Sequence, residues 1–266
     1  MEVSENSFEH NSVSSQIAEK QEREAVPLAH EAIHEKVARL LSEQSARGLL
    51  LDVPAGEGAL AARLVRLGFD VRCCDLYPEI FRLPGVEIKR GDLIGTLPYA
   101  DEEFDFLTCV EGLEHVENPQ QAIREFHRLL RTGGQLVVTV PNILNIEERL
   151  KWLFNGYTSH FKPLSREALE DVRREFGGME EIALHVNPIS YSELRYTLEK
   201  YGFEIRRLHR DKPKANLWAY WPLVALIRAI GRLTSERKRR ARWTDELQSD
   251  EILLGGNTLI IHAVRS

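Results

Sequence analysis

The sequence predicts an α/β protein with a doubly wound sheet of seven mostly parallel strands. Short, continuously apolar runs alternate with segments of helical spacing, a pattern typical of parallel strands that helices cover on both faces. Two further strands follow in succession near the C-terminus, which indicates an antiparallel pair at one edge of the sheet. At 266 residues, the chain is long enough to bury such a core.

The expected elements follow the chain in order. Apolar residues at helical spacing predict helices over about 27–45, 59–67, 120–130 and 191–201. Apolar runs that end at Gly, Asp or Pro predict strands over 48–53, 69–74, 86–89, 104–110, 135–140, 203–208 and 258–264. Two long stretches interrupt this alternation, and we expect helical, functional insertions at about 142–190 and 210–254. The polar residues 1–24 predict a disordered tail, which leaves 25–266 as the domain.

Composition narrows the class of protein. The chain is 43% hydrophobic and 29% charged with a net charge of −6, which excludes collagen-like, coiled-coil and wholly disordered proteins. A mildly acidic chain creates no overall field for nucleic acid, so no nucleic-acid partner is expected. The N-terminus lacks the apolar segment of a secretory signal, and three cysteines do not make a disulfide framework. We therefore expect a cytoplasmic protein.

A candidate nucleotide site lies where the first strand meets the next helix, in the segment 49–60 (LLLDVPAGEGAL). The small residues Ala55, Gly56 and Gly58 allow a ligand to lie against the backbone at the start of a helix. The run from Gly56 to Ala61 also matches the glycine fingerprint of dinucleotide-binding proteins. A nicotinamide-dependent oxidoreductase is therefore one interpretation of this segment.

Two carboxylates help to choose between ligands. Asp52 ends the first strand, where it would repel the pyrophosphate of a dinucleotide but attract an ammonium group. S-adenosylmethionine carries an α-ammonium and a sulfonium, so it suits this position better. Asp75 ends the second strand, where an acidic side chain can accept hydrogen bonds from both ribose hydroxyls.

Six ordered motifs extend this pattern along the chain. They are Asp52-x-Pro54-Ala55-Gly56-x-Gly58, Asp75, Gly91-Asp92-Leu93, Leu97-Pro98-Tyr99 through Phe104-Asp105-Phe106, Glu111-Gly112-Leu113-Glu114-His115 and Leu130-x-x-Gly133-Gly134. Together they resemble the motifs of class I S-adenosylmethionine-dependent methyltransferases, which have a Rossmann-like fold. The resemblance covers about residues 45–141 and the C-terminal strand pair; Pro54 stands where that family usually has glycine.

The resemblance implies a role for each of these residues. Asp52 would bind the methionine ammonium, and Ala55, Gly56 and Gly58 would give backbone contact. Asp75 would bind the ribose and Leu76 would lie against the adenine. The remaining implied contacts are Asp92 with the adenine amino group, a backbone amide from Leu93, and Glu111 beside the methionine tail.

Acceptor determinants are expected in the insertion at 142–190. A hydroxyl acceptor must lose its proton, and His160 is the candidate general base. Tyr157 is a candidate orienting group and His185 a lesser candidate base. The spacing of Cys, His and carboxylate residues predicts no metal site.

The second insertion contains an apolar segment, 217–233, followed by the basic run SERKRRAR. Aromatic residues at one end and arginines at the other suit a helix that lies at a membrane interface, over 217–242. A helix that covers the sheet or contacts a second subunit is the alternative.

These observations predict an S-adenosylmethionine-dependent methyltransferase that acts on a small or lipid-linked acceptor. The expected reaction is O-methylation of a sugar or quinone-like hydroxyl, and the expected location is the cytoplasm, peripheral on the inner face of the membrane. The alternatives are a non-catalytic S-adenosylmethionine-binding protein and the NAD-dependent oxidoreductase.

Overall fold

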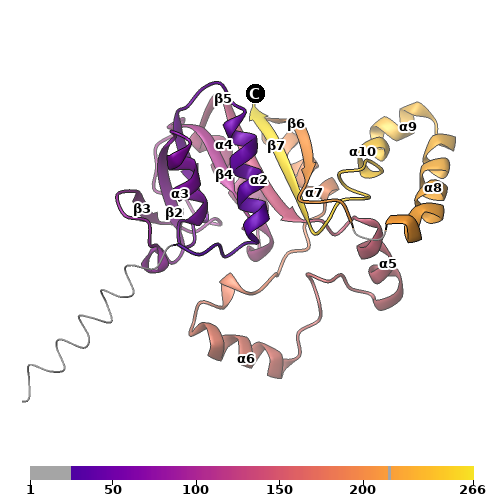
Figure 1. Cartoon of the computed structure of the whole chain (residues 1–266), viewed down its shortest axis with the longest axis horizontal. Helices are drawn as coiled ribbons and strands as arrows, with labels where there is room; N and C mark the ends of the chain where they lie inside the picture. Colours follow the sequence, from indigo (N-terminus) through magenta and orange to yellow (C-terminus); the bar gives the residue numbers. More distant parts are fainter. Residues whose placement is uncertain (1–24, 215–216) are drawn as a thin grey trace, which may run out of the picture.

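The computed structural model describes residues 25–214 and 217–266, so the tail expected over 1–24 lies outside the described residues. It contains one seven-stranded sheet of order β3-β2-β1-β4-β5-β7-β6 (Figure 1). The strands are β1 (Leu49–Asp52), β2 (Asp70–Asp75), β3 (Glu87–Arg90), β4 (Phe104–Cys109), β5 (Leu130–Pro141), β6 (Phe203–Arg210) and β7 (Thr258–Arg265).

Strand directions match the expected class. The pairs from β3 to β5 are parallel, whereas β7 pairs antiparallel with both β5 and β6. This arrangement confirms the predicted doubly wound sheet with an antiparallel C-terminal pair.

The helices of the described chain are α2 (Glu31–Ser42), α3 (Ala59–Arg66), α4 (Pro119–Leu129), α5 (Ile146–Asn155), α6 (Arg166–Phe176), α7 (Tyr191–Lys200), α8 (Leu217–Leu233), α9 (Glu236–Ala241) and α10 (Thr244–Leu247). Short 3-10 turns lie at η1 (Pro78–Ile80), η2 (Leu113–His115) and η3 (Glu180–Ile182). The first helix is shorter than expected because His30 caps its start: Nδ1 of His30 accepts from the amide of Ala32. Residues 25–30 precede this cap and are not helical.

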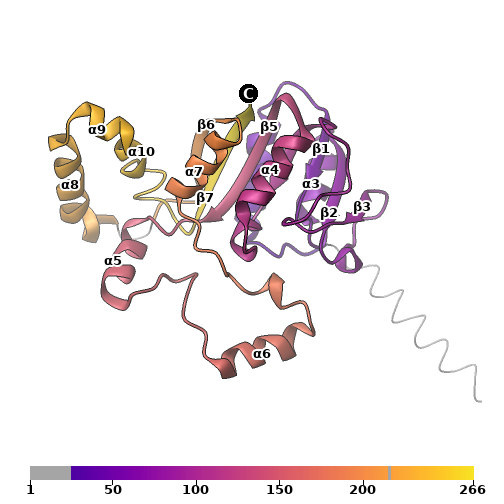
Figure 2. The same cartoon turned by 180° about the vertical axis from the view of Figure 1, so that it is seen from behind.

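Helices cover both faces of the sheet, as the continuous apolar strands require. In β1, Leu50 packs into a core with α2 and α3, and its neighbour Leu51 packs into the opposite core with α4 and α7. Figure 1 shows the α2 and α3 side, and Figure 2 shows the α4 and α7 side. Successive strand residues therefore contribute to different cores, because strand side chains alternate between the two faces.

The two expected insertion regions contain the remaining helices. Residues between β5 and α7 form α5, α6 and η3, and α8–α10 lie between β6 and β7. Helix α8 does not cover the sheet: Val224 packs with Ile146 of α5 and with Leu253 and Leu254 in a separate small core. Both views show α5 and α8 near one another, beyond the β6 edge of the sheet.

Within residues 25–214 and 217–266, no helix combines the length and the apolar character that crossing a bilayer requires.

Candidate active site

A cavity of about 880 Å³ opens at the carboxyl ends of the parallel strands. Its wall includes the residues that follow β1 (52–57), β2 (75–77), β3 (91–94) and β4 (110–112). Because parallel strands end at one edge of the sheet, these four loops converge although they are far apart in the sequence.

The cavity collects most of the residues that the sequence singled out. Those that line it are Asp52, Ala55, Gly56, Asp75, Leu76, Asp92, Leu93, Glu111 and His160. Gly58 is not in the wall; it is the N-cap of α3, with φ +94, and a Cβ there would lie 2.8 Å from the Phe81 ring. Tyr157 is half-buried and also lies outside the wall.

Asp52 presents a buried carboxylate to the cavity. Its Oδ1 accepts from Thr108 Oγ1 at 2.7 Å, whereas its Oδ2 is buried and has no hydrogen-bond partner within the described chain. Burial raises the pKa of Asp52 to about 7, although the Thr108 bond lowers it, and Asp75 raises it further. An unpartnered buried oxygen is costly, so this atom fits a cationic donor such as an ammonium group.

Asp75 ties the glycine turn to the end of β2. Its Oδ2 accepts from the amide of Gly56 at 2.8 Å, and its Oδ1 accepts from the amide of Tyr77 at 2.9 Å. Gly56 has φ +53, a left-handed conformation that favours glycine. Each carboxylate oxygen can accept a second bond, so Asp75 can hold the turn and still accept from ligand hydroxyls.

The loop after β3 places Asp92 and Leu93 on the next part of the wall. Asp92 is exposed, and its Oδ1 accepts from the amide of Ile94 at 3.0 Å. Leu93 is buried beneath it. The preceding Gly91 is tightly enclosed, since a Cβ there would lie 2.5 Å from Cys74 Sγ. This part of the wall combines an exposed acceptor with an apolar surface, which suits a polar heteroaromatic ring.

Glu111 occupies a strained position after β4. It has φ +49, and two hydrogen bonds with Thr139 of β5 hold it there, its amide donating at 2.9 Å and its Oε1 accepting at 2.8 Å. Burial raises the pKa of Glu111 to about 7, against the Thr139 bond, and Asp211 raises it further. The side of the cavity nearest β1 and β4 thus carries two carboxyls that titrate near neutral pH.

The first insertion delivers His160 to the cavity. The buried Glu148 of α5 accepts from the amide and the hydroxyl of the adjacent Ser159, at 2.6 and 2.9 Å, and pairs with Lys151 at 3.0 Å. Burial lowers the pKa of His160, with Lys151 among the charges that add to the effect. His160 is therefore neutral at pH 7 and can accept a proton.

The lesser candidate His185 also lies in the wall, stacked on His160 at a ring distance of 5.9 Å. Its ring also meets that of His115 edge to face at 4.7 Å. Wall residues that were not predicted come from the segment 26–34, from η3, which contains Glu181, and from Asp211 and Lys212 after β6.

Two long-range contacts hold these segments over the cavity. Tyr77 donates from its hydroxyl to Glu181 Oε2 at 2.6 Å, and Glu57 Oε2 accepts from the amide of Val26 at 2.9 Å. No local pattern in the sequence marks either contact, because each joins segments that only the fold brings together.

Comparison with known proteins agrees with this geometry. Residues 51–138 match the family described as "Methyltransferase domain". The chain is 29% identical over 163 residues to a ubiquinone biosynthesis O-methyltransferase of Psychrobacter cryohalolentis, covering 53% of this chain and 63% of that protein. It is 32% identical over 124 residues to a demethylmenaquinone methyltransferase of Listeria welshimeri, covering 43% and 52%. The chain thus matches less than two thirds of the length of either relative.

Solved structures share the fold across nearly the whole chain. A SAM-dependent methyltransferase from Archaeoglobus fulgidus aligns with a TM-score of 0.57 at 14% identity, covering 95% of this chain and 99% of that one. The matched residues include the carboxyl ends of β1, β2, β3 and β4, which form the cavity. Residues 51–138 therefore match a methyltransferase domain, in agreement with the ordered motifs, and the chain as a whole shares the fold of that solved structure.

Proposed function

We propose that the protein transfers a methyl group from S-adenosylmethionine to a hydroxyl of a small, quinone-like or sugar acceptor. The observation that carries this proposal is the buried, unpartnered Oδ2 of Asp52 at the end of β1. It stands in a cavity large enough for a nucleoside and an acceptor together. The relatives named for ubiquinone and demethylmenaquinone methylation support a quinone-like acceptor.

In this proposal the ends of β1 and β2 hold the donor. Asp52 Oδ2 accepts from the ammonium. The turn at Ala55 and Gly56 contacts the ligand through its backbone, and Gly58, the N-cap of α3, follows this turn. Asp75 accepts from the ribose hydroxyls while it retains its bonds to the turn.

The other two loops complete the proposed donor site. Leu76 packs against the adenine, and the amino group of that ring donates to Asp92. Leu93 offers a backbone amide, and Glu111 lies beside the methionine tail.

The acceptor side needs a base and a dry, aligned site. S-adenosylmethionine, when bound, supplies an already activated methyl group on a sulfonium. The chain contributes proximity and exclusion of water, since an in-line displacement gains most from alignment. His160 takes the hydroxyl proton as the new O–C bond forms, and Glu148 holds the loop that presents it.

Two other interpretations of the cavity are separable by experiment. Calorimetry should give a saturable heat with S-adenosylmethionine and none with NADH; NADH binding alone would favour the oxidoreductase. Turnover is measured as S-adenosylhomocysteine formed with a panel of demethylated quinols, glycans and lipid-linked sugars. Cofactor binding with no turnover on the panel would favour a non-catalytic binding protein.

We also propose that the protein docks peripherally on the inner face of the cytoplasmic membrane through α5 and α8. The outward face of α8 exposes Trp218 (81%), Trp221, Ile230 and Leu233 (87%). Helix α5 adds a second exposed patch of Trp152, Leu153 and Phe154. Clustered aromatic and aliphatic side chains beside a basic segment match the chemistry of an anionic lipid surface.

Vesicle binding tests this docking surface. The protein should co-sediment with phosphatidylglycerol vesicles more strongly than with phosphatidylcholine vesicles. The double variant W218D/F154D should lose about tenfold of that affinity. Tyr196→Asp, at an exposed aromatic position on α7, is the control. Unchanged sedimentation of the double variant would contradict membrane docking. If the double variant is a monomer where the wild type is a dimer, the surface is a subunit contact instead.

A further inference from the structure

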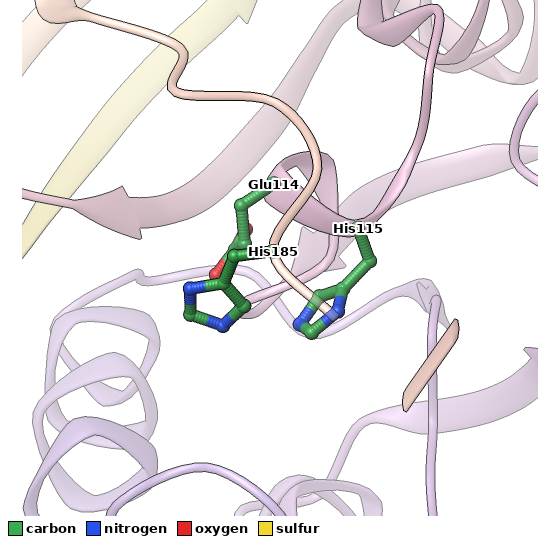
Figure 3. Close-up of side chains that lie close together, drawn as sticks. All are labelled: Glu114, His115 and His185. Atoms are coloured by element: carbon green, nitrogen blue, oxygen red, sulfur yellow. The ribbon is translucent and has the colours of Figure 1, made fainter. Parts of the chain in front are cut away.

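Three side chains of types that can bind a metal ion converge in one cluster (Figure 3). Glu114 and His115 belong to η2, directly after β4, and His185 comes from the segment between η3 and α7. One potential ligand atom from each lies within 4.8 Å of the other two. Glu114 and His115 end the motif Glu111–His115, but neither of them has a role in the proposed cofactor site.

Backbone hydrogen bonds hold the two segments together. The carbonyl of Glu114 accepts from the amides of Val186 at 2.9 Å and Asn187 at 3.0 Å. The carbonyl of Leu184 lies 3.0 Å from Nδ1 of His115. His185 is thus fixed opposite the end of η2 by bonds on both sides of it.

Three polar atoms of this cluster lack a hydrogen-bond partner in the described chain. The Glu114 side chain is fully buried, yet neither of its carboxylate oxygens has a hydrogen-bond partner in the described chain. Nδ1 of His185 is also buried and unpartnered there. Buried polar groups are nearly always satisfied, so two such residues facing one another indicate a missing ligand.

The histidine next to Glu114 is arranged as metal ligands usually are. A carbonyl beside one ring nitrogen fixes the tautomer and leaves the other nitrogen with a free lone pair. In His115, Nδ1–H donates to the Leu184 carbonyl, so Nε2 of the neutral ring carries the free lone pair. The hydrogen bond from Nδ1 to the Leu184 carbonyl thus orients the His115 ring as such bonds orient metal-binding histidines.

We propose that Glu114, His115 and His185 bind a divalent transition-metal ion, with Zn²⁺ the best match. Two imidazoles and one carboxylate suit zinc and its neighbours, whereas magnesium and calcium prefer oxygen ligands. Tetrahedral zinc with bonds of about 2.0–2.2 Å requires ligand atoms roughly 3.3 Å apart, so binding would draw the three side chains inward. This proposal replaces the sequence-based expectation of no metal site.

The ion would border the methyl-transfer cavity. His115 and His185 line the cavity while Glu114 lies buried behind them, so the open coordination position faces the cavity. This step rests on the proposed function: the open coordination position would bind the acceptor oxygen and favour its deprotonated form. The metal site itself stands on the cluster and does not require that activity.

Metal binding to the full chain, without substrates, tests the site. Protein freed of metal by a chelator should bind one equivalent of Zn²⁺ in calorimetry, and Co²⁺ should give the visible absorption of a low-symmetry site. Glu114→Gln and His185→Ala should each weaken Zn²⁺ binding at least about tenfold, because each removes a ligand. Glu117→Gln, on the same cavity wall, and His262→Ala, on β7, are the matched controls and should bind as the wild type does.

The outcomes separate the two proposals. Absence of stoichiometric Zn²⁺ binding, or equal affinity in the ligand variants and their controls, would overturn the metal site. S-adenosylmethionine binding by the same variants reports that they are folded. Zn²⁺ binding in a protein that never methylates an acceptor would leave the metal site standing and refute the proposed activity.

Discussion

The two sides of the cavity are built differently. On the side that we assign to the cofactor, Asp52, Asp75 and Glu111 each end a strand or follow it directly. On the acceptor side, His160 and His185 come from the long insertion after β5, and Asp211 follows β6. The regular alternation of strands and helices positions the residues of the cofactor side. Long-range contacts between irregular segments position those of the acceptor side.

Burial acts on both sides but with opposite consequences for charge. It raises the pKa values of the Asp52 and Glu111 carboxyls and lowers the pKa of the His160 and His185 imidazoles. Both shifts favour the neutral form of the side chain. The Asp52 and Glu111 carboxyls can therefore lose their protons when a cationic ligand binds, while the His160 imidazole stays neutral and able to act as a base.

The largest expected effect lies on the acceptor side. His160→Ala should lower kcat by about 10²- to 10⁴-fold, the usual contribution of a general base. The affinity for S-adenosylmethionine should stay within about twofold, because the donor site is built by other loops. Steady-state kinetics and calorimetry measure the two quantities.

Tyr157→Phe is the control for that variant. Its side chain lies outside the cavity wall, so turnover should change little. Equal losses in both variants would show that the loop acts only as a structural unit and would remove His160 from the mechanism.

The next effect lies on the cofactor side. Asp52→Asn keeps the shape and the Thr108 contact but removes the carboxylate, and should weaken S-adenosylmethionine binding about 30- to 100-fold. Asp70→Asn removes an exposed carboxylate at the start of β2 and should have no effect. Tight binding by Asp52→Asn would contradict the ammonium contact.

Proton linkage sharpens the same comparison. Because the pKa of Asp52 is about 7 in the ligand-free protein, a cationic ligand must displace its proton at lower pH. S-adenosylmethionine affinity should be flat above about pH 7.5 and fall below pH 7, by up to about tenfold per pH unit for each proton that binding displaces. Calorimetry in buffers of different ionisation enthalpy measures the released proton.

The Asp52→Asn variant provides the reference for this linkage. In this variant the S-adenosylmethionine affinity should no longer depend on the protonation of residue 52. The remaining pH dependence is expected from Glu111, whose pKa is also about 7. An identical pH profile in wild type and variant would assign the proton to another group.

The smallest effect concerns the contact between the two sides. Tyr77→Phe removes the hydroxyl that donates to Glu181 and so loosens η3 from the loop after β2. Both side chains are partly exposed, so KM for S-adenosylmethionine should rise only about two- to fivefold with kcat unchanged. A kcat loss without a change in KM would instead connect Tyr77 to the acceptor side.

The sequence by itself determined the doubly wound, mostly parallel sheet, its antiparallel C-terminal pair and the cofactor motifs. Continuous apolar runs specify strands buried on both faces, and Asp52 and Asp75 are recognised from their positions at strand ends, so neighbours in the chain suffice. The role of Asp92 came from the resemblance to a known family. Only the tertiary structure decided that Tyr157 lies off the cavity, that Glu181 closes on Tyr77, and that Glu114 and His115 meet His185. These contacts join residues far apart in the chain, and their geometry depends on how irregular insertions pack, which no local periodicity encodes.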